Sequence, residues 1–164
     1  MTSISWAESY VGQLRALAGD RTLMFIGARA VVRDAAGRIL LIERSDNGHW
    51  AMPAGAMELG ESIADCAARE VWEETGLRAA AVTPFALHTG PDRTITNMYG
   101  HTYQLFTVAF RVDGWNGDLV TVTDETTNAG FFPPDGFPAP ISPAVAETLD
   151  DLATFERTGR VVLK

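Results

Sequence analysis

The 164-residue chain contains little that could cross-link it or hold it in a membrane. Its single cysteine, Cys66, excludes an intramolecular disulfide, and it has no run of about eighteen apolar residues that could span a bilayer. The opening stretch MTSISWAESYVGQL lacks the basic segment and apolar run of a secretory signal. Basic residues are scarce, because 13 Lys and Arg face 21 Asp and Glu, and the net charge of −8 argues against a nucleic-acid polymer as partner. We therefore expect a cytoplasmic protein that acts on neither membranes nor nucleic-acid polymers.

The composition is that of one globular domain, with 46% hydrophobic and 21% charged residues. We predict a single domain over residues 1–164, in which residues 1–20 form a helical extension. In this extension, Ser5 and Glu8 have the spacing of a capping box, and a helix is predicted over 5–18. Its apolar stripe consists of Trp6, Tyr10, Leu14 and Leu17.

The remaining pattern alternates strands with helices. Strands are predicted over 22–34, 38–44, 77–89 and 101–113, and a tight turn at 114–118 is predicted to lead into a further strand, LVTVTD. Helices are predicted over 62–75, capped by Ser62 and ended by Gly76, and from Ser142 to near Gly159, with Pro143 in the first position. The prolines of 131–140 predict an irregular segment. This order predicts a mixed sheet covered by helices on its faces, an α/β (α+β) architecture.

Three glutamates gather at the end of the helix predicted over 62–75. Glu70, Glu73 and Glu74 precede Gly76, where the helix dipole disfavours each carboxylate by roughly 0.3–1 kcal/mol. At about 100° per residue, the three side chains share an arc of roughly 100°. The residues predicted to face the core lie on another side: Ala64, Ala68, Val71 and Thr75. Converging carboxylate oxygens are the ligands that a hard divalent cation such as Mg²⁺ requires.

A solvated acidic face is the alternative interpretation of this helix. Arg69 can reach Glu73 at the i, i+4 spacing, but the helix contains no lysine that would offset the cluster. Several local rules broken at one place are typical of a functional site. The helix by itself leaves both interpretations open.

The spacing around the helix resembles a known family motif. The chain resembles the Nudix box at every fixed position: Gly55, five residues, Glu61, seven residues, REV, one residue, EE, one residue and GL. The approach HWAMPAG (49–55) is similar to the family's tryptophan–proline–glycine lead-in, with Ala54 where a second glycine is commoner. The resemblance implies an α/β/α sandwich and a Mg²⁺-dependent hydrolase that splits a diphosphate bond in a nucleotide, with Mn²⁺ as an alternative cofactor.

The resemblance also implies roles for the matched residues. The implied metal ligands are Glu70, Glu73, Glu74 and the Gly55 backbone carbonyl. Arg69 and Glu61 are implied to pair and brace the loop against the helix, because metal ligands must be held in position. The general base stays open, since some family members use a box glutamate, here Glu73, and others use a loop glutamate. The best loop candidate is Glu125 in VTDETTNAGFF, with Asp92 as a weaker one, and Glu125 could instead be a plain turn residue.

The substrate is the least determined feature. The segment 88–103 is long and polar for a strand connection, so we place substrate contacts there, at Arg93, Asn97 and Tyr99. The candidate substrates are a nucleoside triphosphate, oxidised ones included, and an ADP-ribose-like diphosphate. Packing rather than stacking on a base is expected of Phe25, Phe85, Tyr99, Tyr103, Phe132 and Trp50, and structural roles of His49, His88 and His101. The alternative function is a catalytically silent nucleotide-binding regulator, and a homodimer is the expected assembly.

Overall fold

A mixed six-stranded sheet forms the centre of the computed structural model, which describes residues 4–164. The first three residues of the predicted N-terminal extension lie outside the described range. The strand order is β11-β6-β8-β1-β4, and β7 pairs with β8. The strands of this sheet are β1 Leu23–Val31, β4 Ala54–Ala56, β6 Val82–His88, β7 Thr94–Thr96, β8 Thr102–Val112 and β11 Val162–Leu163.

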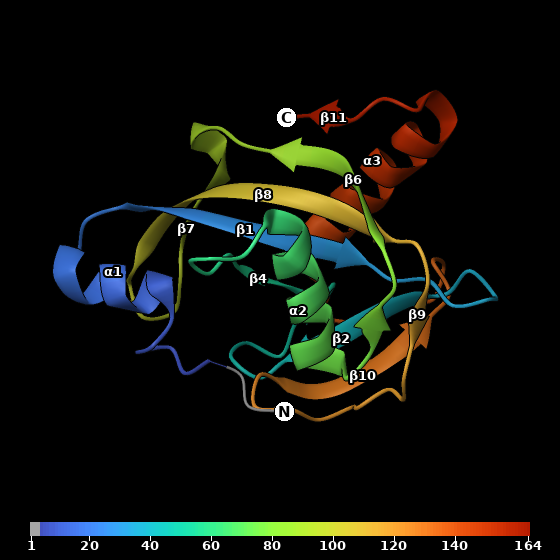
Figure 1. Cartoon of the computed structure of the whole chain (residues 1–164), viewed down its shortest axis with the longest axis horizontal. Coiled ribbons are helices and arrows are strands. Elements are labelled where there is room, and N and C mark those ends of the chain that lie inside the picture. Colours follow the sequence, from blue (N-terminus) through green and yellow to red (C-terminus); the bar gives the residue numbers. More distant parts are fainter. Residues whose placement is uncertain (1–3) are drawn as a thin grey trace.

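Two smaller sheets and four helical segments complete the fold (Figure 1). The second sheet has the order β10-β2-β3, and a third pairs β5 with β9. These strands are β2 Ile39–Arg44, β3 Trp50–Ala51, β5 Arg78–Ala79, β9 Trp115–Asn116 and β10 Thr126–Phe132. The helices are α1 Tyr10–Ala18, α2 Ile63–Thr75, α3 Ala144–Thr158 and the short 3₁₀ helix η1 Pro91–Arg93. Among the helices of residues 4–164, none is long and apolar enough to cross a membrane.

Alternate residues of β1 point to opposite faces of the central sheet. Ala28 and Ala30 belong to the core clusters that contain the α2 residues Ala67 and Val71. Val31 belongs to the cluster that contains residues of α3. Helices therefore cover both faces of a mixed sheet, which confirms the predicted fold class.

Helix α2 begins and ends where the sequence predicts. The Ser62 hydroxyl accepts a hydrogen bond from the Asp65 N–H (3.1 Å), and the Asp65 carboxylate accepts one from the Ser62 N–H (3.2 Å). This capping box satisfies two N–H groups that the first turn would otherwise leave free. Gly76 ends the helix in the left-handed conformation, with φ 74°, which a residue without a Cβ adopts readily.

The buried face of α2 matches the prediction at Val71 and Thr75, which are fully buried, and differs from it elsewhere. Ala64 and Ala68 are only half-buried, whereas Glu70 and Glu74 are 7% and 2% exposed. The face turns toward the acidic residues because the segment containing β4 packs there. The solvated acidic face considered above is therefore wrong for two of the three glutamates.

Helix α1 starts later than predicted. Ser9, rather than Ser5, is its N-cap and accepts a hydrogen bond from the Gly12 N–H at 3.0 Å. The predicted apolar stripe is wrong, since Trp6 and Leu17 are exposed. The buried residues of α1 are Val11, Gly12 and Arg15.

The predictions also need correction in the C-terminal half. The strand predicted over 77–89 divides into β5 and β6. LVTVTD forms no strand, because the Val120 N–H instead donates to the carbonyl of Thr75, the last residue of α2 (2.8 Å). The sequence missed β10, which pairs antiparallel with β2, and Phe131 and Phe132 end this strand rather than belonging to the irregular segment. Segment 114–118 contains β9, which pairs with β5, rather than a hairpin turn.

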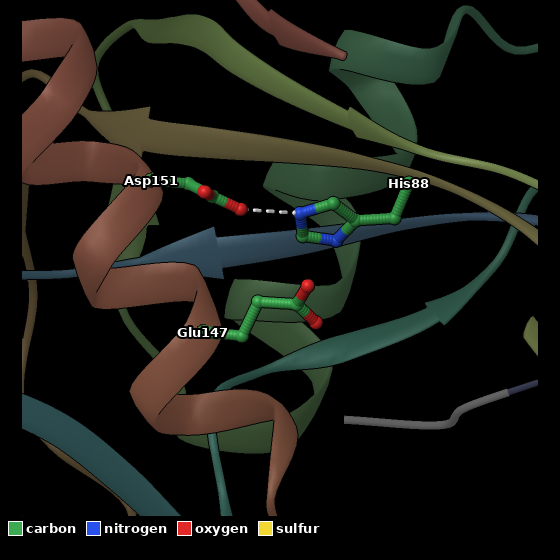
Figure 2. Close-up of side chains that lie close together, drawn as sticks. All are labelled: His88, Glu147 and Asp151. Atoms are coloured by element: carbon green, nitrogen blue, oxygen red, sulfur yellow. Dashed lines mark hydrogen bonds and ion pairs between the residues drawn. The ribbon is translucent and has the colours of Figure 1, made fainter. Parts of the chain in front are cut away.

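Helix α3 is joined to β6 by buried polar groups. The His88 ring Nε2 lies 2.8 Å from Asp151 Oδ2, and Glu147 is directed toward the same space from one turn away (Figure 2). The start of α3 differs from the prediction, because Pro143 is the N-cap and has no side chain that could cap. Ser142 instead contributes its carbonyl, which accepts from the Val145 N–H at 3.0 Å.

Candidate active site

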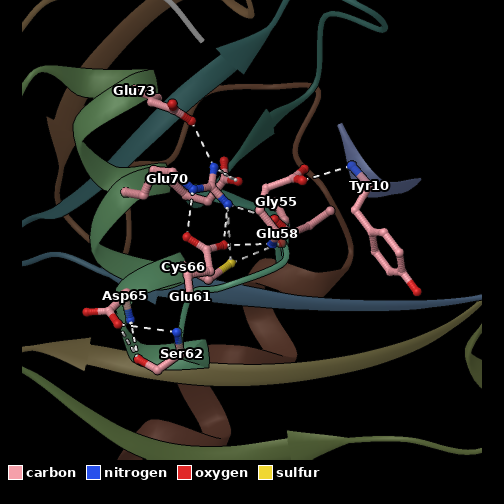
Figure 3. Close-up of polar contacts among 11 residues, drawn as sticks. Tyr10, Gly55, Glu58, Glu61, Ser62, Asp65, Cys66, Glu70 and Glu73 are labelled. Atoms are coloured by element: carbon pink, nitrogen blue, oxygen red, sulfur yellow. Dashed lines mark hydrogen bonds and ion pairs between the residues drawn. The ribbon is translucent and has the colours of Figure 1, made fainter. Parts of the chain in front are cut away.

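The Arg69 guanidinium is the centre of the acidic cluster on α2. Figure 3 shows its partners Glu61, Glu70 and Glu73. Its Nε and Nη2 donate to both carboxylate oxygens of Glu61 at 3.0 and 2.8 Å. Its Nη1 donates to Glu70 (2.7 Å) and to Glu73 (2.8 Å), and Nη2 also reaches the Ala56 carbonyl (2.8 Å). One side chain therefore fixes the loop, through Glu61 and Ala56, to the carboxylates of the helix.

Gly55 lies where the loop passes closest to α2. A Cβ atom at this position would lie 2.2 Å from the Glu70 carboxylate, which is far inside van der Waals contact. The neighbouring Ala54 N–H donates to Glu74 Oε2 at 3.0 Å, so the alanine in place of the commoner glycine keeps its backbone contact. The Gly55 carbonyl is also held near the helix, 3.8 Å from the Cys66 sulfur.

Burial makes the cluster electrostatically unusual. Desolvation raises the pKa of Glu70 to about 7, although Arg69 opposes the shift. The pKa of Glu74 is raised well above its ordinary value by burial and by the charge of Glu70. For Glu61 burial acts in the same direction, but the hydrogen bonds from Arg69 and from the Glu58 N–H outweigh it and lower the pKa. Two carboxylates thus lack enough positive charge, which a divalent cation would supply to these hard oxygen ligands.

Glu125, which lies outside the box, affects the pKa values of the cluster through its negative charge. It directly precedes β10, and its carbonyl accepts a hydrogen bond from the Ser45 N–H (2.9 Å) just after β2. Its side chain is exposed, and its charge adds to the effects that raise the pKa of Glu70 and Glu74, after burial and nearer groups. Asp92 lies elsewhere, in η1 beside Arg93.

The three predicted substrate contacts are separated in the structure. Arg93 lines a pocket of about 250 Å³ on the α3 face and makes two hydrogen bonds to Glu147, at 2.7 and 2.8 Å. Asn97 and Tyr99 lie beyond the paired residues Thr96 and Thr102, in the turn that joins β7 to β8. The Asn97 side chain is used within that turn, where its oxygen accepts from the N–H groups of Tyr99 and His101.

The pocket contains residues that the sequence reasoning missed. Its lining residues are Arg29, His88, Asp92, Arg93, Ile95, Leu105, Thr107, Pro143, Ala144 and Glu147. Arg29 pairs in register with Ala54, so the pocket begins one residue from Gly55, on the other face of β1. The signal was an arginine inside the apolar strand FIGARAVV, since a charge in a buried strand needs a specific partner. Here that partner is the Thr148 hydroxyl, 3.0 Å from Nη1.

A second acidic group lies beside this pocket. Within residues 4–164, His88, Glu147 and Asp151 are the three side chains whose possible ligand atoms lie within 4.8 Å of one another. Their charges already have partners, because Arg93 binds Glu147, and Lys164 Nζ lies 2.7 Å from Asp151. The group is therefore a network of ion pairs that joins α3 to β6.

The aromatic candidates pack as the sequence predicts, except Tyr99, which is 71% exposed because it lies in the turn between β7 and β8. Phe85 and Tyr103 are buried. Phe132 packs edge-on against Trp50, with ring centroids 5.1 Å apart, and Phe25 packs edge-on against Tyr103 at 5.7 Å.

Comparison with known proteins gives consistent matches. The model of the NUDIX domain family matches residues 24–152. A MutT-like protein of Streptomyces ambofaciens is 35% identical over 109 residues, which cover 66% of this chain and 62% of that protein. Phosphatase NudJ of Escherichia coli is 41% identical over 69 residues, 40% of this chain and 45% of the relative. The chain thus spans less than two thirds of these relatives.

A solved structure supports the fold. The crystal structure of a MutT NUDIX hydrolase from Burkholderia pseudomallei superimposes with a TM-score of 0.66 at 24% identity, covering 80% of this chain and 99% of that chain. The family match extends from β1 into α3 and includes the whole box with its Arg69-centred cluster. The chain therefore belongs to the NUDIX domain family.

Proposed function

We propose that the chain is a Mg²⁺-dependent hydrolase, with Mn²⁺ as an alternative, that splits a diphosphate bond in a nucleotide. The observation that carries this proposal is the pair of buried carboxylates, Glu70 and Glu74, packed against the Gly55 loop without sufficient positive charge. Such a pair is costly for a fold that does not use it. Both carboxylates lie in the family box, so we infer that the fold keeps this unfavourable burial because the pair binds metal.

The implied ligands suit a divalent cation by their chemistry, because all are oxygen donors. They are the carboxylates of Glu70, Glu73 and Glu74 and the carbonyl of Gly55. In residues 4–164 the three carboxylates do not lie within 4.8 Å of one another, and Arg69 Nη1 bonds to both Glu70 and Glu73. When bound, the cation supplies positive charge that neutralises the diphosphate and polarises its oxygens. Arg69 and Glu61 act by orientation, because the guanidinium connects the loop to both Glu70 and Glu73.

The proton of the attacking water requires a base, for which Glu73 and Glu125 are the two candidates. Glu73 is held by Arg69 at 2.8 Å, whereas the side chain of Glu125 is exposed, and its negative charge contributes to raising the pKa of Glu70. We favour Glu125 for this reason. A Glu125→Gln variant should lose roughly 10²–10⁴-fold in kcat, the usual contribution of general base catalysis. Turnover close to that of the wild type would assign the role to Glu73.

We place the nucleoside or the group X in the pocket beside Arg29. The pocket lies within one residue of the metal-binding loop and offers the paired Arg93 and Glu147 as polar contacts. Asn97 and Tyr99 stay as proposed contacts of a larger substrate, because Asn97 lies two residues, about 7 Å of extended chain, beyond Ile95 of the pocket. The substrate classes are a nucleoside triphosphate, oxidised ones included, and an ADP-ribose-like diphosphate.

A nucleotide panel with Mg²⁺, analysed for phosphate, pyrophosphate and nucleoside monophosphate, tests the proposal. We expect one substrate class to be hydrolysed and a chelator to abolish the reaction. Tight binding of one nucleotide without any product would instead support the silent regulator. The proposed homodimer requires a light-scattering mass of about twice 17.7 kDa.

A further inference from the structure

Helix α1 lies outside the family-matched residues 24–152, yet its first residue contacts the box loop. The Tyr10 N–H donates to Glu58 Oε2 at 2.8 Å (Figure 3). This N–H is one of those that the first turn of a helix leaves without an intrahelical partner, and the positive end of the helix dipole favours a carboxylate there. Glu58 belongs to the loop between Gly55 and Glu61, so the contact joins the extension to the candidate metal site.

The position of α1 is fixed from its other end. Arg15 is buried, with its guanidinium 4.6 Å from the centre of the Tyr103 ring. The same guanidinium donates to the carbonyls of Gly19 (2.6 Å), Arg21 (2.8 Å) and Thr102 (3.1 Å). Because β8 and the chain after α1 both hold Arg15, the helix presents its N-terminus at a set place.

Glu58 connects the fixed helix α1 to the candidate active site through Glu61 and Arg69. Its backbone N–H donates to Glu61 Oε1 at 2.8 Å, and the same oxygen accepts from Arg69 Nη2 at 2.8 Å. Arg69 in turn holds Glu70 and Glu73. A continuous series of hydrogen bonds therefore runs from α1 to the carboxylates proposed to bind metal.

We propose that α1 holds the metal-binding loop in place and that Glu58 is the positioning residue through which it acts. The inference rests on the proposed function for its kinetic consequence. With the contact intact, Glu58 keeps its N–H on Glu61, and Glu61 keeps Arg69 in place against Glu70 and Glu73. Without it, Gly55 stays paired with Ala28 in the sheet, but Glu58 loses its contact with α1. We expect the displacement at Glu61 and Arg69, which hold Glu70 and Glu73.

The contact can be removed at either of its two partners. Tyr10→Pro deletes the donor, and proline is favoured at the first position of a helix, so α1 itself should persist. Ser9 has φ −65° and ψ 151°, a conformation that suits the residue before proline. Tyr10→Ala is the matched control, because it removes the same side chain and keeps the N–H.

We expect Tyr10→Pro to need roughly tenfold more Mg²⁺ for half-maximal activity, the lower end of effects seen for groups that hold metal ligands. The KM for nucleotide should stay unchanged, and Tyr10→Ala should match the wild type. Glu58→Ala should reproduce the Tyr10→Pro effect, and Glu58→Gln, which keeps an acceptor oxygen, should restore most of the affinity. Glu8→Ala is the control for an exposed glutamate of the same segment.

The double variant decides whether Glu58 acts through α1. If it does, Glu58→Ala should have little further effect in the Tyr10→Pro chain, because the contact is already lost. A full tenfold effect in that background would overturn the inference and indicate a direct role of Glu58. Equal Mg²⁺ requirements of Tyr10→Pro and Tyr10→Ala would overturn it as well.

A readout without turnover separates this inference from the proposed function. Hydrogen exchange of the Glu58 amide and direct Mn²⁺ titration can be measured whether or not any nucleotide is hydrolysed. Faster exchange and weaker Mn²⁺ binding in Tyr10→Pro than in Tyr10→Ala support the positioning role. If the wild type hydrolyses nothing on the panel but these differences appear, the proposed function fails and the positioning role stands; if they are absent, the positioning role fails.

Discussion

Gly55 is the residue at which loop and helix come closest, and the space for its side chain is already filled by the Glu70 carboxylate. Its backbone has no positive φ, so the absence of a Cβ, rather than conformational freedom, is the requirement. The same residue is the proposed source of a carbonyl ligand. Position 55 therefore has to leave room for the Glu70 carboxylate and, by our proposal, also supplies a carbonyl ligand.

Gly55→Ala should displace either the loop or Glu70. We expect a stability loss of about 1–3 kcal/mol, as for other overpacked sites, and a fall in kcat larger than the unfolded fraction explains. Ala54→Gly is the matched control, because it changes the neighbouring residue without adding atoms. Thermal unfolding and steady-state kinetics of both variants test this, and a Gly55→Ala enzyme with wild-type kcat would contradict it.

Glu70 gives a pH dependence of known sign. Burial raises its pKa to about 7 in the folded chain, against about 4.3 in the unfolded chain. Between these values the folded state binds more protons, so the free energy of unfolding should fall as the pH rises from about 4.3 to about 7. Urea unfolding with a chelator present should show this slope, and Mg²⁺ should reduce it by stabilising the ionised form. Glu70→Gln should remove its part of the slope, and a slope of opposite sign would contradict the assignment.

At the scale of elements, α2 is the part on which the site depends. Its N-terminus is fixed by the Ser62–Asp65 capping box, far from the glutamates, and its C-terminus by Gly76. The carboxylates sit in the last turns, where the dipole disfavours them, so stability has to come from the caps and from packing. This separation allows stability and activity to be changed independently.

Ser62→Ala should therefore lower stability by about 1 kcal/mol, the usual cost of an N-cap. Activity of the folded enzyme at low temperature should be unchanged, because the cap lies at the opposite end of the helix from Glu73 and Glu74. Calorimetry with parallel kinetics tests this expectation. Ser5→Ala, in an exposed turn, is the control and should change neither quantity, while loss of kcat in Ser62→Ala would show that the cap and the site are coupled.

At the scale of the whole molecule, ion pairs join segments far apart in the chain. Arg93, in the connection after β6, is bound to Glu147 of α3, and Lys164 near β11 is bound to Asp151. The hydrogen bonds from Arg93 hold the pKa of Glu147 at about 2. A folded-state pKa below the unfolded value stabilises the fold above about pH 4.3, and the contribution is lost as the pH falls toward about 2.

The carboxylates of Glu147 and Glu70 change the free energy of unfolding in opposite directions as the pH rises. Without metal, the stability contributed by these two groups should therefore be greatest at about pH 4.3, where the window of Glu147 below meets that of Glu70 above. Glu147→Gln should flatten the acid side of the profile and leave the neutral side unchanged. Unfolding free energies measured across this range test the assignment. An acid side as steep as that of the wild type would show that other carboxylates dominate acid unfolding.

Much of the fold follows from local signals in the sequence. Ser62 and Gly76 bound α2 correctly, and the apolar runs of β1, β2 and β8 lie where predicted. The errors occur where the partner is distant in sequence. TTNAGFF becomes β10 because the edge of β2 is available to it, and Arg78–Ala79 pairs with Trp115–Asn116 across the chain. Propensity alone does not contain such pairings.

The sequence by itself determined where the family box lies, since the spacing from Gly55 to Leu77 requires only a loop followed by a helix. The tertiary structure decided how these residues are held. It buried Glu70 and Glu74, brought Arg29 beside Ala54, and set α1 against Glu58. The physical reason is that burial and long-range hydrogen bonds depend on which surfaces meet, and a local pattern does not specify that.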